Sequence, residues 1–244
     1  MRKLLLASTI LTIGVASASA ADDLGPRSYT KAPALAPAYD WSGFYIGGQA
    51  GGASLSPSFK DDDDFFGNKG LNPDRKYSFT GGVYGGYNWQ LNSLVVGVDA
   101  QWSWYGDSSV TSIPGGTKAV LEGFNFFLRT KVLDAGSVKA RVGLAFQDTL
   151  VYVAAGPAWA HSTFTVRGGG GLLFNEISET AYRSGIAVAA GAEHMFTPHL
   201  VGRGQIQYSD FGTQHVNFID PRARLTFGQQ TSIVEATAGL AYKF

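Results

Sequence analysis

The segment "IVEATAGLAYKF" at residues 233–244 alternates between two kinds of position with a period of two. One set is apolar and consists of Val234, Ala236, Ala238, Leu240, Tyr242 and Phe244. The intervening set is Glu235, Thr237, Gly239, Ala241 and Lys243. Such alternation places one set on each face of a β-strand. The apolar face reaches Phe244, so we expect whatever medium or protein surface covers this face to extend as far as Phe244.

The same alternation recurs along the chain from Trp41, between clusters of turn residues, and no amphipathic helix of convincing length interrupts it. We predict eight strands, near residues 41–55, 78–90, 94–106, 137–146, 150–161, 182–196, 199–211 and 233–244. Residues 123–134 are expected to extend the fourth strand outward. The fifth strand is apolar on both faces and contains Pro157, which cannot donate to a ladder. Its register stays open, with a bulge or a rim position for the proline as the two interpretations.

Connections between the predicted strands alternate in length. Those at "LNS", "QDT" and "TPH" are tight. The others are long and polar or rich in glycine, near residues 56–77, 107–119 (or as far as 135), 162–181 and 212–229. Short turns at one end and long loops at the other are typical of a transmembrane β-barrel, whose strands need about 9–11 residues each.

Composition favours lipid over water as the solvent of the apolar face. The chain has 32 Gly, 16 Phe, 11 Tyr and 5 Trp, no cysteine, and 16% charged residues, against about 25% in soluble domains. Large aromatic residues are expected at strand ends on the apolar face, as interfacial girdles. They are Trp41, Phe79, Trp89, Trp102, Trp104, Phe196, Tyr242 and Phe244. The alternative is a soluble β-sandwich, which would also show alternation.

The opposite face carries charges that balance one another. Three acids, Asp99, Glu193 and Glu235, share this predicted face with three bases, Lys139, Arg141 and Arg203. Isolated buried ions are very costly, so charges inside a barrel need partners. An eight-stranded barrel is only wide enough inside for side chains. We therefore predict an internal network of ion pairs and hydrogen bonds, against the alternative of six unrelated surface charges.

Hydrocarbon also dictates how the strands must connect. Every backbone N–H and C=O within lipid has to be paired internally, so the sheet must have no edges and its last strand must pair with its first. The predicted fold is all-β, a transmembrane antiparallel up-and-down β-barrel of eight strands.

The N-terminal region predicts export. Arg2 and Lys3 precede an apolar stretch of 13 residues and the small-residue site "ASA", which is typical of a secretory signal peptide at residues 1–20. The stretch is shorter than the roughly 17 residues that a spanning helix needs. Residues 21–40 read as a linker rich in proline and alanine, and 41–244 as the barrel. After cleavage the formal net charge is −2, which argues against a nucleic-acid partner.

Two motifs in the predicted loops invite a chemical interpretation. The acidic run at residues 61–64 fails the pattern of an EF-hand, because Phe66 and Asn72 occupy the positions of the required glycine and carboxylate. A solvated external loop is the favoured interpretation, and loose bridging of cations or lipopolysaccharide is the alternative. "GGGG" at 168–171 lacks the lysine and hydroxyl of a phosphate-binding loop and is predicted to be a loop tip.

The histidines predict no site. Haem capture would use His161, His194, His199 or His215 with a nearby tyrosine, but the sequence fixes no such geometry. "HSTF" at 161–164 offers a histidine and Thr163, without an assignable acid to orient the histidine as nucleophilic catalysis requires. We predict no catalytic, cofactor-binding or metal-binding residue, and no enzyme activity.

Several stretches together resemble the small outer-membrane β-barrel family of alphaproteobacteria, known as porin-family or outer membrane antigen proteins. They are "YDWSGFYIGG" at 39–48, "GGVYGGYNWQ" at 81–90, "SVKARVGLAF" at 137–146, "AAGAEHMFTP" at 189–198 and the closing "AGLAYKF". The resemblance covers roughly residues 39–244. It implies insertion by the outer-membrane assembly machinery, which recognises a final strand ending in an aromatic residue, here Leu240, Tyr242 and Phe244. Glu235, where members often carry a base, and the long segment 124–134 depart from the family pattern.

The resemblance also sets the expected function. Members are mostly structural, and some are credited with passage of small solutes, haem binding or host contact. We expect a monomer in the outer membrane of a Gram-negative bacterium that contributes to envelope integrity, with a plugged interior and external loops for surface contacts. Its expected partners are outer-membrane lipid, lipopolysaccharide and the assembly machinery. The alternative is a narrow porin-like diffusion channel for small solutes.

Overall fold

The computed structural model describes residues 39–61, 75–112, 125–169, 176–220 and 223–244. They belong to one compact unit, Pro37–Phe244. Within these ranges nine β-strands occur, and no helix is long and apolar enough to span a bilayer. The strands are β1 (Gly43–Asp61), β2 (Lys76–Leu91), β3 (Leu94–Tyr105), β4 (Ser109–Ser112), β5 (Asn125–Phe146), β6 (Thr149–Gly169), β7 (Glu176–Thr197), β8 (Leu200–Asp220) and β9 (Ala223–Lys243).

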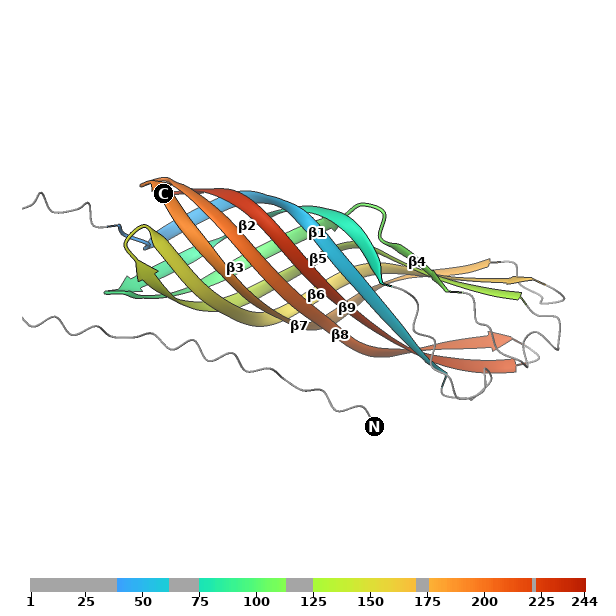
Figure 1. The fold of residues 1–244 in the computed structure, drawn as a ribbon. Helices are drawn as coiled ribbons and strands as arrows, with labels where there is room; N and C mark the ends of the chain where they lie inside the picture. The colour runs from blue at the N-terminus through green and yellow to red at the C-terminus, as the bar shows by residue number, and fades with distance from the viewer. Residues whose placement is uncertain (1–38, 62–74, 113–124, 170–175, 221–222) are drawn as a thin grey trace, which may run out of the picture. The chain divides into compact units, whose positions relative to one another are not determined.

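The strands form one antiparallel sheet that closes on itself (Figure 1). Its order is β3-β2-β1-β9-β8-β7-β6-β5, and the ring closes where β3 pairs with β5. The first and last strands are neighbours, with Tyr45 opposite Lys243, as the need for a sheet without edges predicts. The short strand β4 pairs only with β5, alongside residues 128–131. Eight strands therefore make the wall, which confirms the predicted barrel.

The two faces of the wall follow the alternation in the sequence. On β3, Val98 is 43% exposed on the outer face and its neighbour Asp99 is fully buried inside. The same division holds on β5, where Val138 and Val142 face outward and Lys139 and Arg141 are buried. Because apolar side chains cover the outside and polar ones the inside, this barrel has the reverse arrangement of a soluble protein.

Trp41 does not belong to the outer girdle, and that prediction was wrong. Its side chain is 1% exposed and packs inside the short-turn end against a buried apolar cluster. Its backbone N–H donates to Gln90 Oε1 at 2.7 Å, and its indole Nε1 donates to the carbonyl of Gln147 at 3.3 Å. Trp41 precedes β1, so the alternation of that strand does not decide its direction. The other predicted girdle residues lie on the outer face, with Trp102 partly covered by Trp159.

Pro157 occupies neither a bulge nor the rim. It faces outward in the wall, opposite Ile186 of β7. On the β5 side, Ser137 pairs with Ala158 and Ala140 with Ala155, so the register is the same before and after the proline. The ladder therefore accommodates the missing N–H locally. The irregularity between β5 and β6 lies at Val132/Asp134 instead.

Two of the predicted long loops are largely strand. β6 extends to Gly169 and β7 begins at Glu176. In the same way, β8 extends to Asp220 and β9 begins at Ala223. The polar and glycine-rich sequences of these outer segments read as loops, which is why the strand signal was missed there. The predicted extension of the fourth strand is confirmed, because β5 begins at Asn125. Most of the acidic run and half of "GGGG" lie outside the described residues.

Candidate functional site: the polar interior of the barrel

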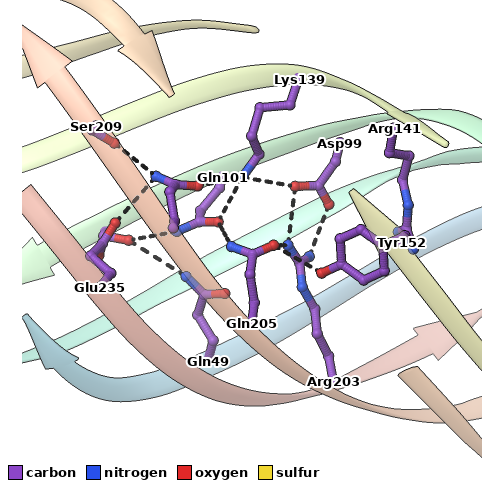
Figure 2. A network of polar contacts seen from close by, with 12 residues as sticks. Gln49, Asp99, Gln101, Lys139, Arg141, Tyr152, Arg203, Gln205, Ser209 and Glu235 are labelled. Atoms are coloured by element: carbon purple, nitrogen blue, oxygen red, sulfur yellow. Dashed lines mark hydrogen bonds and ion pairs between the residues drawn. The ribbon is translucent and has the colours of Figure 1, made fainter. Parts of the chain in front are cut away.

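Asp99 on β3 is the centre of the interior (Figure 2). Its carboxylate accepts two hydrogen bonds from the Arg203 guanidinium, at 2.9 and 3.2 Å, and one from the hydroxyl of Tyr45, at 2.9 Å. The Lys139 ammonium lies 3.4 Å away. Paired, charge-assisted contacts of this kind compensate for the lost hydration of buried ions. Four strands, β1, β3, β5 and β8, meet at this one carboxylate.

A second ion pair joins Arg141 of β5 to Glu193 of β7 at 3.0 Å. Arg141 Nη1 also donates to the Tyr45 hydroxyl at 3.0 Å, and that hydroxyl donates to Asp99. Tyr45 therefore connects the two ion groups. Register alone would suggest a different partner, because Glu193 lies opposite Arg203 in the β7–β8 ladder.

Glu235 is held by neutral groups. Its two carboxylate oxygens accept hydrogen bonds from Thr80 Oγ1 at 3.4 Å and Gln207 Nε2 at 3.3 Å. In the described part of the chain no cation lies within ion-pair distance of Glu235. Lys139 reaches it only indirectly, through a 2.5 Å hydrogen bond to Gln207 Oε1. The third predicted acid thus shares the network without a direct ionic partner.

Aromatic rings alternate with the two guanidinium groups. The Arg141 guanidinium carbon lies 3.9 Å from the centre of the Tyr152 ring, and that of Arg203 lies 4.3 Å from the Tyr84 ring. Cation–π contacts of this kind stabilise a desolvated guanidinium. The tyrosines therefore solvate the cations and fill the lumen at the same time.

Sequence reasoning missed most of the neutral members of the network. Gln101, Gln205 and Tyr152 complete it: Gln205 Nε2 donates to Gln101 Oε1 at 2.8 Å, and the Tyr152 hydroxyl donates to Gln205 Oε1 at 2.9 Å. Arg203 also donates to Gln205. A fourth inward cation, Arg183 of β7, is buried and donates to Thr231 Oγ1 at 3.4 Å. The inward phase of each strand was a signal for these residues, because they fall on the same alternate positions as the charges.

Apolar layers lie above and below the polar network. At the short-turn end Trp41 packs with Val95, Leu150, Met195 and Val201. A cavity of about 10 Å³ beside Trp41, Tyr45 and Tyr84 is no larger than a single water molecule needs. Toward the other end a larger buried layer crosses the lumen. It consists of Ala53, Leu55, Tyr105, Val132, Ala135, Ala158, Ala160, Ala187, Phe211 and Ile233.

The remaining predicted residues lie at the surface. Leu240, Tyr242 and Phe244 expose 56%, 51% and 67% of their surface on the outer face. The Phe244 N–H donates to the carbonyl of Phe44 at 3.0 Å, so the end of the chain is held against β1.

The described histidines, His161, His194 and His199, each have partners of their own. His161 Nδ1 lies 3.4 Å from Asp134 Oδ2 and its ring stacks on Tyr182, so an acid that the sequence did not assign lies beside His161. Thr163, the hydroxyl considered with it, contacts Thr180 instead, at 3.0 Å. His194 and His199 are exposed near the short turns, and the side chain of His215 is outside the described set. No cluster of three metal-binding side chains occurs among the residues that the structure describes.

A closed antiparallel ring with an apolar exterior and an ionic interior is a transmembrane β-barrel, the class of integral protein found in bacterial outer membranes. The chain belongs to the outer membrane protein beta-barrel domain family, whose model matches residues 8–244. It is an outer-membrane protein of a Gram-negative bacterium, in the alphaproteobacterial branch of that family.

The chain is similar to several known proteins and solved structures. The 31 kDa outer-membrane immunogenic protein of Brucella melitensis biotype 1 is 31% identical over 255 residues, covering 100% of both chains. The 22 kDa outer membrane protein of Rhizobium leguminosarum bv. viciae is 30% identical over 175 residues, covering 72% of this chain and 66% of that protein. The crystal structure of Neisserial surface protein A matches with a TM-score of 0.41 at 18% identity, over 83% of this chain and 98% of that one.

Proposed function

We propose that this protein is a structural component of the outer membrane that contributes to envelope integrity and passes no solute. The polar interior supports the proposal: its ionic side chains bind one another, and apolar layers lie on both sides of them. A solute crossing the barrel would have to separate ion pairs in a region of low dielectric, and removing one partner of such a pair costs about 3–5 kcal/mol.

We propose several further roles for segments of this chain. Residues 1–20 are cleaved as a signal peptide and 21–40 serve as a periplasmic linker. Leu240, Tyr242 and Phe244 are read by the assembly machinery as its recognition signal, which their exposure on the outer face favours. The protein works as a monomer, has no enzymatic role and binds no nucleic acid. Its external segments make surface contacts. The Brucella relatives are named immunogenic outer-membrane proteins, which supports exposure of these segments at the cell surface.

Single-channel recording in planar bilayers separates a plugged barrel from the alternative, a narrow diffusion channel. The wild type is expected to stay silent after verified insertion. Arg141→Ala and Glu193→Ala are expected to leak, because each leaves its buried partner unpaired and opens space beside it. Ile186→Ala, which trims a lipid-facing side chain that is 65% exposed, is the control and stays silent. Steady openings in the wild type would favour the channel and contradict the plugged interior.

Envelope integrity needs a test in cells. Deleting the gene is expected to raise sensitivity to detergents and large antibiotics, and the wild-type gene is expected to restore resistance. A deletion strain with an unchanged barrier would contradict the structural role, whatever the conductance of the purified protein.

A further inference from the structure

A band of hydroxyl and cationic residues lies on the outer face of β5, β6 and β7, beyond the apolar part of the wall. Two consecutive rows of cross-strand neighbours define it, and we call them the outer polar rows. The first row is Lys131, Thr163 and Thr180, and the second is Arg129, Thr165 and Ser178. Their intervening inward neighbours Thr130 and Ser162 are buried, so the two rows share the outward side of the sheet.

The hydroxyls in these rows are already aligned by contacts between strands. Thr163 Oγ1 lies 3.0 Å from Thr180 Oγ1, and Thr165 Oγ1 lies 3.1 Å from Ser178 Oγ. Arg129 Nη2 donates to Ser109 Oγ on β4 at 2.8 Å. Each hydroxyl keeps further capacity to donate or accept. The four hydroxyls and Arg129 are therefore held in place before any ligand arrives.

The two cations of the outer polar rows make no ion pair among the described residues, because Asp107, whose carboxylate interacts electrostatically with Arg129, is paired with Lys76. Arg129 and Lys131 are exposed, and neither makes an ion pair with another described residue. The nearest acid in the ladder is Asp134, one row closer to the membrane, and its carboxylate contacts His161. In the row on the far side of the patch, Arg167 lies opposite Glu176. The rows themselves thus present two positive charges and no negative one.

The height of the patch on the barrel indicates what it meets. Along β6 the outward positions from Val151 to Pro157 are apolar. The next outward residue is Trp159, whose ring centre lies 6.2 Å from that of Trp102. The first hydroxyl of the rows, Thr163, stands two outward positions further along the strand. Aromatic residues mark the level where hydrocarbon gives way to headgroups. The outer polar rows therefore stand at the headgroup level, on the side of the long connections.

We propose that the outer polar rows bind the phosphorylated sugar headgroup of a glycolipid in the outer leaflet. Arg129 and Lys131 pair with its phosphate groups, which guanidinium and ammonium groups bind strongly. The hydroxyls of Thr163, Thr165, Ser178 and Thr180 exchange hydrogen bonds with the sugar. Three strands at about 4.8 Å spacing give a surface roughly 10 Å wide, enough for more than a single sugar ring. The proposal requires only the outer-membrane location and is independent of whether the lumen conducts.

The test is a titration of the full chain, purified in detergent, with lipid A carrying both phosphates and with the same lipid dephosphorylated, read by native mass spectrometry. The wild type is expected to prefer the phosphorylated lipid. Arg129→Ala/Lys131→Ala is expected to weaken its binding about fivefold for each cation removed and to abolish the preference. Arg75→Ala removes a cation at the same end of the barrel, outside the rows, without disturbing the Lys76–Asp107 ion pair, and is expected to bind as the wild type does.

A second variant keeps the proposal testable if the first folds poorly. Thr163→Val/Thr165→Val preserves the charge and the strand propensity of both sites and is expected to weaken binding of both lipids alike. The heat-dependent gel shift of a folded barrel verifies each sample. Equal affinity of the wild type for both lipids would overturn the proposal. So would unchanged binding by both row variants, or a fivefold loss in Arg75→Ala, which would reveal a general effect of charge.

Discussion

Arg203 and Asp99 form a bidentate ion pair across the interior of the barrel. Their strands, β8 and β3, are four places apart in the ring of eight, and the guanidinium nevertheless makes contacts of 2.9 and 3.2 Å with the carboxylate. Opposite walls are thereby bound directly to each other through the interior. The ladder hydrogen bonds join only neighbouring strands, so this pair adds a constraint that the sheet itself does not provide.

Replacing Asp99 by Asn is expected to be severely destabilising, because it leaves Arg203 and Lys139 as buried cations without their carboxylate. The expected loss is about 3–5 kcal/mol in the free energy of unfolding, measured by reversible urea titration in lipid vesicles. Asp107→Asn is the control, because its ion pair with Lys76 is exposed and screened by solvent, so little change in stability is expected. Similar effects of the two substitutions would contradict the assigned role of Asp99.

The two buried glutamates are expected to respond differently to the same change. Glu193→Gln loses the direct ion pair with Arg141 and should cost several times more than Glu235→Gln. Glu235 accepts long hydrogen bonds from neutral groups, so a neutral glutamine there is expected to change the unfolding free energy by no more than about 1 kcal/mol. Urea titration of both variants tests this, and an equal or larger loss at Glu235 would show that its charge has an ionic role.

Substitution by alanine is expected to have opposite effects on stability at two glycines in the wall, Gly86 and Gly204. A Cβ at Gly86 would lie 2.1 Å from the carbonyl oxygen of Val98 and 2.5 Å from the Tyr45 hydroxyl. Gly86→Ala is therefore expected to displace Tyr45 and cost about 1–3 kcal/mol. A Cβ at Gly204 would meet nothing within 4 Å, so Gly204→Ala is expected to be neutral or slightly stabilising. If Gly86→Ala were as stable as Gly204→Ala, the contact with Tyr45 would not be tight.

Trp41→Ala is expected to destabilise the short-turn end. It removes a fully buried aromatic from the cluster with Leu150 and Met195, for which losses of about 3–5 kcal/mol are usual. Faster hydrogen exchange at the turns near Gln90 and Gln147 should accompany the loss, since both residues accept hydrogen bonds from Trp41. Trp89→Ala, which trims a lipid-facing tryptophan, is the comparison. Unchanged exchange in Trp41→Ala would mean that this end is held closed by other contacts.

The period-two pattern predicts the barrel because lipid and lumen impose opposite demands on alternate positions. Val98 and Asp99 are adjacent in the chain, and their opposite exposure follows directly from that pattern. Beyond the membrane no lipid requires an apolar outer face, so the polar and glycine-rich outer parts of β6–β7 and β8–β9 resemble loops in sequence. Trp41 was misplaced because it stands before the first strand, where alternation gives no direction.

The sequence predicts which charged residues face the interior, but it does not predict which of them form ion pairs with one another. Each inward charge is recognisable from the phase of its own strand. Which acid meets which base depends on the distance across the lumen: Glu193 lies opposite Arg203 in the ladder and pairs with Arg141 instead. The contact of Asp134 with His161 likewise follows the register shift at Val132/Asp134, which no pattern in the sequence indicates.

Lipid must cover the apolar face of the barrel while the polar face is closed off inside. Methyl-labelled NMR of the protein in nanodiscs, with a paramagnetic agent confined to the lipid phase, tests this directly. Val98 and Val95 lie on the same strand, with 43% and 1% of their surface exposed. We predict strong broadening of the Val98 methyl signals and none of those of Val95. Equal broadening of both, or broadening of Val95 alone, would contradict the account.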